Sequence, residues 1–145
     1  MYMYKMQLDH MTDRCLESLE GQFDDLPATN HADGSYRLRR YSRVSMSSDT
    51  LTYQTLSGKQ FTQSSSYNDF QGNITRTFEN ISDDIISSYG FWELCSRFLN
   101  SFRLPPENVV EVHQMRVITL EDDTQVAPEG VHQDGYDAIC IASVQ

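Results

Sequence analysis

The order of the predicted elements indicates an α+β fold, in which helices pack against an antiparallel sheet. Two segments carry apolar residues at helical spacing, one near the N-terminus and one after residue 82, and each is followed by runs that read as strands. The chain has 145 residues, within the range of about 100 to 200 residues that one domain usually takes. We therefore predict a single domain over 1–145, with a helical lead-in at about 1–30 and a β-rich core with one long helix at about 31–145.

The first helix is predicted from Tyr4 to Leu19, before Gly21 and Pro27 close the segment. The apolar residues that fall near helical spacing in it are Met6, Leu8, Met11, Cys15, Leu16 and Leu19. The turn-forming stretch LPATNHADGS then separates this helix from the first strand.

The first strand is predicted at 36–46, because its residues alternate between two faces. One face holds Tyr36, Leu38, Arg40, Ser42, Val44 and Met46, and the other, strongly basic, holds Arg37, Arg39, Tyr41 and Arg43. A short polar turn leads to TLTYQTL (50–56), which we expect to pair with this strand. The polar segment 57–81 reads as a long loop, and loops of that length in small domains are often functional.

The second helix is predicted to begin after Ser82, with Asp83 and Asp84 in its first turn, where the helix dipole favours anions. Its core-packing stripe consists of Ile85, Tyr89, Trp92, Cys95, Leu99 and Phe102. The stretch NVVEVHQMRVITL (108–120) is the clearest strand, and a final strand is expected from Val131 to the end of the chain. A last strand leaves a sheet edge unpaired, so the domain looks incomplete at its C-terminus and could form a homo-oligomer through that edge.

The composition excludes some partners. The chain has 21 acidic and 11 basic residues, a formal charge of −10 and a pI near 4.6, which repels nucleic acid and anionic membrane surfaces. Its three cysteines form no C-x-x-C pair, and its N-terminus has no apolar run like that of a signal peptide. We therefore expect a cytoplasmic protein.

A histidine and an aspartate two positions apart, His132 and Asp134, stand in PEGVHQDG (128–135). On a strand both project from the same side, so both can reach one ion. An imidazole and a carboxylate belong to the two-histidine-one-carboxylate set that holds Fe(II) and leaves positions open for substrate and dioxygen. The pair alone also arises by chance, and a hydrogen-bonded histidine explains it as well.

Longer stretches of the sequence favour a metal site over a chance pair. HADGSYRLRRYSRV (31–44), QSSSYNDFQGNITRTFENI (63–81), VHQMRV (112–117) and PEGVHQDG resemble, in this order, the bacterial 2-oxoglutarate/Fe(II) dioxygenases related to L-isoleucine dioxygenase. The resemblance implies a double-stranded β-helix (jelly roll, cupin-like) core, Fe(II) held by His132 and Asp134, 2-oxoglutarate as cosubstrate, and dioxygen. It implies hydroxylation of a free L-amino acid or similar small substrate, with oxidative decarboxylation of 2-oxoglutarate to succinate.

The sequence departs from that family in one respect. The family takes a second histidine ligand and an arginine for 2-oxoglutarate from strands downstream of the pair, and this chain ends at residue 145. We interpret His113 as a structural histidine and not as the third ligand. Two alternatives stay open: a non-catalytic, truncated jelly-roll module for binding or dimerisation with a vestigial His-x-Asp pair, or Asp134 as a general acid or base with His132 as its partner.

Four further residues are candidates for cosubstrate or substrate binding. Gln114 and Arg116 share one face of the 108–120 strand and could bind a carboxylate if that face lines a cavity. Arg40, in the basic run of Arg37, Arg39, Arg40 and Arg43, could anchor an amino-acid carboxylate, although we favour surface ion pairs for most of that run. Glu129 could contact a substrate ammonium group.

Overall fold

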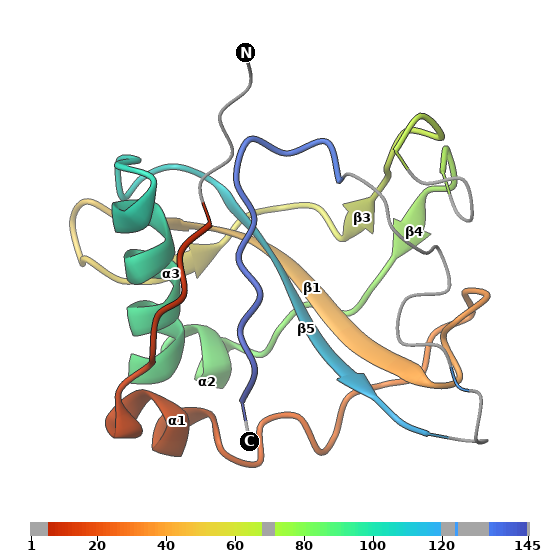
Figure 1. Cartoon of the computed structure of the whole chain (residues 1–145), viewed down its shortest axis with the longest axis horizontal. Coiled ribbons are helices and arrows are strands. Elements are labelled where there is room, and N and C mark those ends of the chain that lie inside the picture. The colour runs from red at the N-terminus through yellow and green to blue at the C-terminus, as the bar shows by residue number, and fades with distance from the viewer. Residues whose placement is uncertain (1–5, 68–71, 120–123, 125–133, 145) are drawn as a thin grey trace.

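The computed structural model describes residues 6–67, 72–119, 124 and 134–144. Its elements in chain order are α1 (Asp13–Leu19), β1 (Arg37–Met46), β2 (Tyr53–Thr55), β3 (Gln60–Phe61), β4 (Arg76–Thr77), α2 (Asp83–Ile86), α3 (Tyr89–Ser101) and β5 (Val110–Val117) (Figure 1). Helices are combined with antiparallel strands, which confirms the α+β prediction. Within these residues no helix has the length and apolar character needed to cross a membrane.

The larger sheet has β1 in its centre, with the strand order β2-β1-β5. Both pairings are antiparallel, and the register places Val44 opposite Val110 on β5 and opposite Thr55 on β2. The predicted strands at 36–46, 50–56 and 108–120 therefore correspond to β1, β2 and β5, although β2 and β5 are shorter than predicted and residue 120 lies outside the described part. β3 and β4 form a separate two-stranded ribbon, and the two sheets do not by themselves make the double-stranded β-helix that the resemblance implies.

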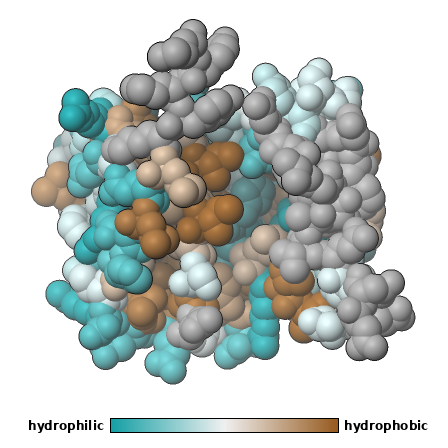
Figure 2. All heavy atoms as spheres, in the orientation of Figure 1, coloured by the Kyte–Doolittle hydropathy of each residue, from teal (hydrophilic) through white to brown (hydrophobic). Residues whose placement is uncertain are grey.

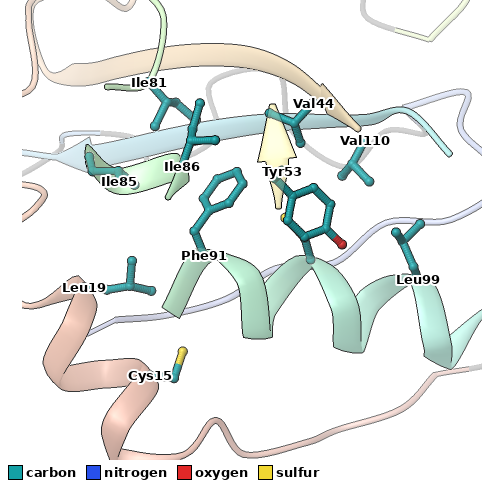
Figure 3. Packing of buried hydrophobic residues seen from close by; sticks show 11 residues of the cluster. Cys15, Leu19, Val44, Tyr53, Ile81, Ile85, Ile86, Phe91, Leu99 and Val110 are labelled. Atoms are coloured by element: carbon teal, nitrogen blue, oxygen red, sulfur yellow. The ribbon is translucent and has the colours of Figure 1, made fainter. Parts of the chain in front are cut away.

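The helices cover one face of the larger sheet. Phe91 and Leu99 point from α3 toward the strands that carry Val44 and Val110 (Figure 3). Burying such side chains is the main favourable contribution to folding, at about 25 cal/mol per Å² of apolar surface. The buried cluster on this side consists of Cys15, Leu19, Val44, Tyr53, Ile81, Ile85, Ile86, Phe91, Cys95, Leu99 and Val110.

The N-terminal helix is shorter than predicted. It begins at Asp13, and Met6 and Leu8 lie before it with 97% and 90% of their surface exposed; residues 1–5 are outside the described part. Thr12 caps the helix, because its Oγ1 accepts a hydrogen bond from the Cys15 amide at 3.2 Å. The Thr12 hydroxyl also donates to the buried Glu93 carboxylate at 2.5 Å, so a contact with α3 fixes where α1 starts.

The second predicted helix is divided into α2 and α3. Ser82 stands at the N-cap of α2 without a side-chain cap bond, whereas the Ser88 Oγ accepts from the Phe91 amide at 3.2 Å and starts a new helix. The break shifts the helical phase, so the predicted stripe is only partly correct. Phe91 is buried in place of Trp92, which is 41% exposed, and Phe102 is 37% exposed, while Ile85, Cys95 and Leu99 are buried as expected.

The predicted last strand is not present in 134–144, and its start at 131–133 lies outside the described residues. This segment begins near β3 and runs past β5 toward α1 (Figure 1). Side chains hold it: the Tyr136 hydroxyl donates to Glu111 at 2.6 Å, and Val144 packs against the core. Figure 2 shows apolar surface on this face of the molecule. Within the segment, Ile139 and Ile141 are 48% and 92% exposed.

Candidate functional site

The candidate site lies on the face of β1 and β5 that points away from the helices. Arg37, Arg39 and Tyr41 of β1 alternate onto this face, and the register sets Tyr41 opposite His113 of β5. The predicted basic face of the first strand is thus confirmed. Its burial was not expected, because Arg37 and Arg39 are only 8% and 4% exposed.

Asp33 neutralises part of this buried charge. Its Oδ2 accepts from Arg37 Nη1 at 2.7 Å and from Arg39 Nη2 at 2.5 Å, and the residue is 1% exposed. The Arg37 amide donates to the Asp33 carbonyl at 2.9 Å, so a tight turn before β1 brings the acid back over the strand. Surface ion pairing is therefore wrong for these two arginines.

The other two arginines of the basic run do form the expected surface pairs. Arg40 Nε lies 3.7 Å from the exposed Glu79 carboxylate, and Arg43 Nε lies 3.8 Å from Glu111. Such exposed pairs contribute about 0 to 1 kcal/mol each. The basic run is thus divided between a buried pair of arginines and a surface pair.

The β3–β4 ribbon covers the site from the side opposite the sheet. The segment 57–81 was predicted as a loop, but it contains these two short strands. Their neighbourhood supplies Phe61 and Phe78, whose rings lie 5.7 and 6.2 Å from the Tyr41 ring, while Phe61 lies 4.7 Å from the His113 ring. The ring contacts agree with a structural role for His113.

Arg76 of β4 is the third arginine of the site. It is 3% exposed, and its guanidinium carbon lies 4.9 Å from the centre of the Phe61 ring. Arg39 lies over Phe78 in the same way at 5.1 Å. A cation over an aromatic face is stabilised by the ring quadrupole, which helps to keep these charges in a largely buried place.

Asp134 reaches this site through Gln63. Gln63 Nε2 donates to Asp134 Oδ1 at 3.0 Å, and Gln63 Oε1 accepts from Arg76 Nη2 at 3.2 Å. Gln63 and Asp134 are 71 positions apart in the chain. Sequence reasoning singled out Asp134 but missed Gln63 and Arg76, since an amide and an arginine in a polar loop give no local signal.

The charges of the site act on His113. The pKa of its imidazole is lowered to about 3, chiefly by burial and also by the charges of Arg39, Arg76 and Arg37, while Asp134 opposes this change. The ring packs against the rings of Tyr41, Phe61 and Phe78, although the residue as a whole is exposed to solvent. At neutral pH His113 is therefore an uncharged imidazole beside three guanidinium groups.

The cosubstrate candidates on β1 and β5 lie on the opposite, helix-side face. Gln114 Nε2 donates to the Gln22 carbonyl at 2.6 Å, Arg116 Nη1 to the Asp24 carboxylate at 2.9 Å, and Arg40 Nη2 to the Asp25 carbonyl at 3.3 Å. That face does not line the site, because alternate residues of a strand point to opposite sides. Glu129 and His132 lie outside the described residues.

Among the described residues, no three His, Cys, Asp or Glu side chains are grouped so that they could hold a metal ion. The described residues bring one candidate ligand, Asp134, to the site. A carboxylate oxygen combined with an imidazole nitrogen is a donor set that suits Fe(II). Asp134 thus supplies one donor of this set, and His132, the other candidate ligand, lies outside the described residues.

Comparisons with known proteins agree with this chemistry. The model of the family described as 2OG-Fe dioxygenase matches residues 20–145. A crystal structure of a bsmA homolog from Methylobium petroleophilum PM1 is similar, with 25% sequence identity and a TM-score of 0.59. The alignment covers 83% of this chain and 51% of that one, so the chain spans about half the length of this neighbour.

No curated protein gives a significant match. The family match covers most of the chain, including the whole basic strand β1, the β3–β4 ribbon and the His132–Asp134 pair. Members of the family use Fe(II), 2-oxoglutarate and dioxygen. The chain belongs to the 2OG-Fe dioxygenase family.

Proposed function

We propose that the protein acts as an Fe(II)/2-oxoglutarate-dependent dioxygenase that hydroxylates a small substrate. The observation that carries this proposal is the family match over 20–145, which includes the His-x-Asp pair. Iron and 2-oxoglutarate would supply an oxidative decarboxylation to succinate, coupled to oxidation of the substrate. His132 and Asp134 would be ligands from this chain, and a jelly-roll core is the fold that the family implies.

A free L-amino acid, as taken by the relatives of L-isoleucine dioxygenase, is the substrate class that we propose. Its support is the charge of the face beside Asp134, where the described residues include three arginines, Arg37, Arg39 and Arg76, and two carboxylates, Asp33 and Asp134. Burial lowers the pKa of Arg39, and Arg37 and Arg76 lower it further while Asp33 opposes them, so the three cations lie close enough to act together. An anionic carboxylate would relieve their mutual repulsion.

The test is an anaerobic Fe(II) titration of the purified protein in the presence of 2-oxoglutarate. We expect a visible charge-transfer band from the metal to the cosubstrate, and succinate release when dioxygen and an L-amino acid are added. Asp134→Ala should abolish the band, whereas Asp137→Ala, which removes an exposed carboxylate from the same segment, should keep it. A protein that forms no band, or one that forms it equally in Asp134→Ala, contradicts the proposal.

The non-catalytic module is a second candidate, and one observation favours it. In the part of the chain that the structure describes, β5 pairs only with β1 and its outer edge carries no further strand. Such an edge can pair with the same edge of a second copy. Sedimentation analysis combined with the titration above distinguishes the two candidates: a stable dimer without metal binding supports the module, and a metal-binding protein with succinate release supports the enzyme.

A further inference from the structure

We propose that Gln63 is a positioning residue for the Asp134 carboxylate and that Arg76 fixes the orientation of the Gln63 amide. The inference rests on the proposed role of Asp134 as a metal ligand. It concerns the 63–67 loop, which leaves the β3–β4 ribbon and meets the chain again at Asp134 and Gly135. The sequence marks this loop as part of a long polar segment but gives no role to any of its residues.

A side chain that bridges the two ends has to donate at one end and accept at the other, and an amide does both. A carboxylate can only accept hydrogen bonds and a guanidinium can only donate them. The residue between Asp134 and Arg76 must therefore donate on one side and accept on the other, as Gln63 does with Nε2 at 3.0 Å and Oε1 at 3.2 Å. A glutamate could accept from Arg76 but would repel Asp134, and an aliphatic side chain could make neither bond.

The bridge from Arg76 through Gln63 to Asp134 is itself held in place. Gln63 is 8% exposed, and its carbonyl accepts from the Asn73 amide at 2.7 Å. Arg76 lies within the ribbon, where it pairs with Phe61 in register and places its guanidinium over the same ring. A buried amide with a fixed backbone and a fixed cation behind it loses little further freedom when it holds the carboxylate.

A second contact links the same loop to the backbone beside Asp134. Gly135 has a φ of +75°, a conformation that glycine adopts without strain, and a Cβ placed there would lie 2.8 Å from the Tyr67 ring. The loop therefore contacts the side chain of residue 134 through Gln63 and the main chain of residue 135 through Tyr67. Two contacts at neighbouring positions restrict both where Asp134 lies and how its carboxylate is turned.

The expected consequence is on metal affinity. Hydrogen-bond partners that orient a metal ligand typically contribute about 10- to 100-fold in affinity. With Oδ1 held by Gln63, the Asp134 carboxylate meets the ion in one orientation and does not have to be ordered during binding. Loss of Gln63 should weaken binding without removing a ligand.

The experiment measures the Kd for Mn(II), followed by the electron paramagnetic resonance signal of the free ion, so no turnover is needed. Gln63→Leu should raise the Kd by about 10- to 100-fold. Thr62→Val is the matched control, because it removes an exposed hydrogen bond of 3.0 Å to Thr75 in the same ribbon, and it should leave the Kd unchanged. Asp134→Ala should abolish binding.

A metal-free measurement keeps the inference testable if Gln63→Leu perturbs the fold. In a double-mutant cycle of Gln63→Leu and Asp134→Ala, the change in the unfolding equilibrium constant should depart from the product of the single changes by about fivefold, as for residues in contact. A Gln63→Leu variant that binds Mn(II) like Thr62→Val, or a cycle that is multiplicative, overturns the inference. Equal Mn(II) binding by wild type and Asp134→Ala refutes the proposed function instead, and the cycle still decides whether Gln63 holds Asp134.

Discussion

The two faces of the β1–β5 pair are stabilised in different ways, although alternate residues of the same two strands form them. The helix-side face buries Val44 and Val110 against α3. The opposite face places Arg37, Arg39 and the His113 ring under the β3–β4 ribbon. One face is stabilised by removing apolar surface from water, and the other keeps buried charge in place through specific partners.

This difference shows that the two faces are stabilised by different kinds of interaction. An apolar face tolerates similar shapes, because its contacts have no direction. A buried charge depends on its particular partner, and losing the partner leaves an uncompensated ion. The face with the paired charges is also the one that Asp134 reaches. The candidate site therefore lies where side chains depend most on specific partners.

The largest effect is expected from Asp33→Asn, because the substitution leaves two buried guanidinium groups without their shared carboxylate. Breaking a buried ion pair typically lowers the free energy of unfolding by about 3 to 5 kcal/mol. Urea unfolding measures it, with Asp49→Asn at an exposed loop position as the control, where changes stay within about 0.5 kcal/mol. Equal losses in the two variants would mean that Asp33 does not stabilise the site face.

On the helix side, Leu99→Ala should lower the free energy of unfolding by about 3 kcal/mol, through lost burial and the cavity left behind. Leu99 is 2% exposed, whereas Leu51, the matched control, is 65% exposed, so Leu51→Ala should have little effect. Denaturant midpoints give both values. If Leu99→Ala also weakened Mn(II) binding in a protein that remains folded, the two faces would not be independent.

A smaller effect, dependent on pH, is expected at His113. Its pKa is lowered in the folded protein, so the unfolded chain takes up a proton at a higher pH than the folded one does. The stability associated with His113 is present above the unfolded pKa near 6.5 and is lost as the pH falls from there toward the folded pKa. His113→Phe keeps an aromatic ring and should flatten this part of the stability curve between pH 7 and pH 5; curves that stay parallel would contradict the assignment.

The smallest effect is expected from Arg116→Met on the helix-side face. The Arg116 side chain is 43% exposed and pairs with Asp24, which is 70% exposed, so about 0 to 1 kcal/mol of unfolding free energy is at stake. Binding of Mn(II) and 2-oxoglutarate should stay as in wild type, because Arg116 points away from Asp134. Loss of 2-oxoglutarate binding in this variant would support the prediction that Arg116 binds the cosubstrate.

Local patterns in the sequence were sufficient for the strands of the larger sheet, but they missed the β3–β4 ribbon and predicted a last strand that 134–144 does not form. Alternation along 36–46 and the valine-rich run at 108–120 each predicted a strand, and the assignment of Arg37, Arg39 and Tyr41 to one face agrees with the structure. Periodicity was less reliable for the helices. The Ser88 cap and the contact between Thr12 and Glu93 set helix starts in the structure. The apolar spacing alone had predicted longer helices.

What the sequence by itself determined is the alternation that makes one face of β1 basic and the short His-x-Asp pair that the family match includes. The tertiary structure alone decided that the basic face is buried and that Gln63 and Arg76 join Asp134 there. The physical reason is the separation along the chain of the residues that interact. Side-chain alternation is a property of neighbouring residues, whereas the contact between Gln63 and Asp134 depends on how the ribbon folds over the sheet across the chain that lies between them.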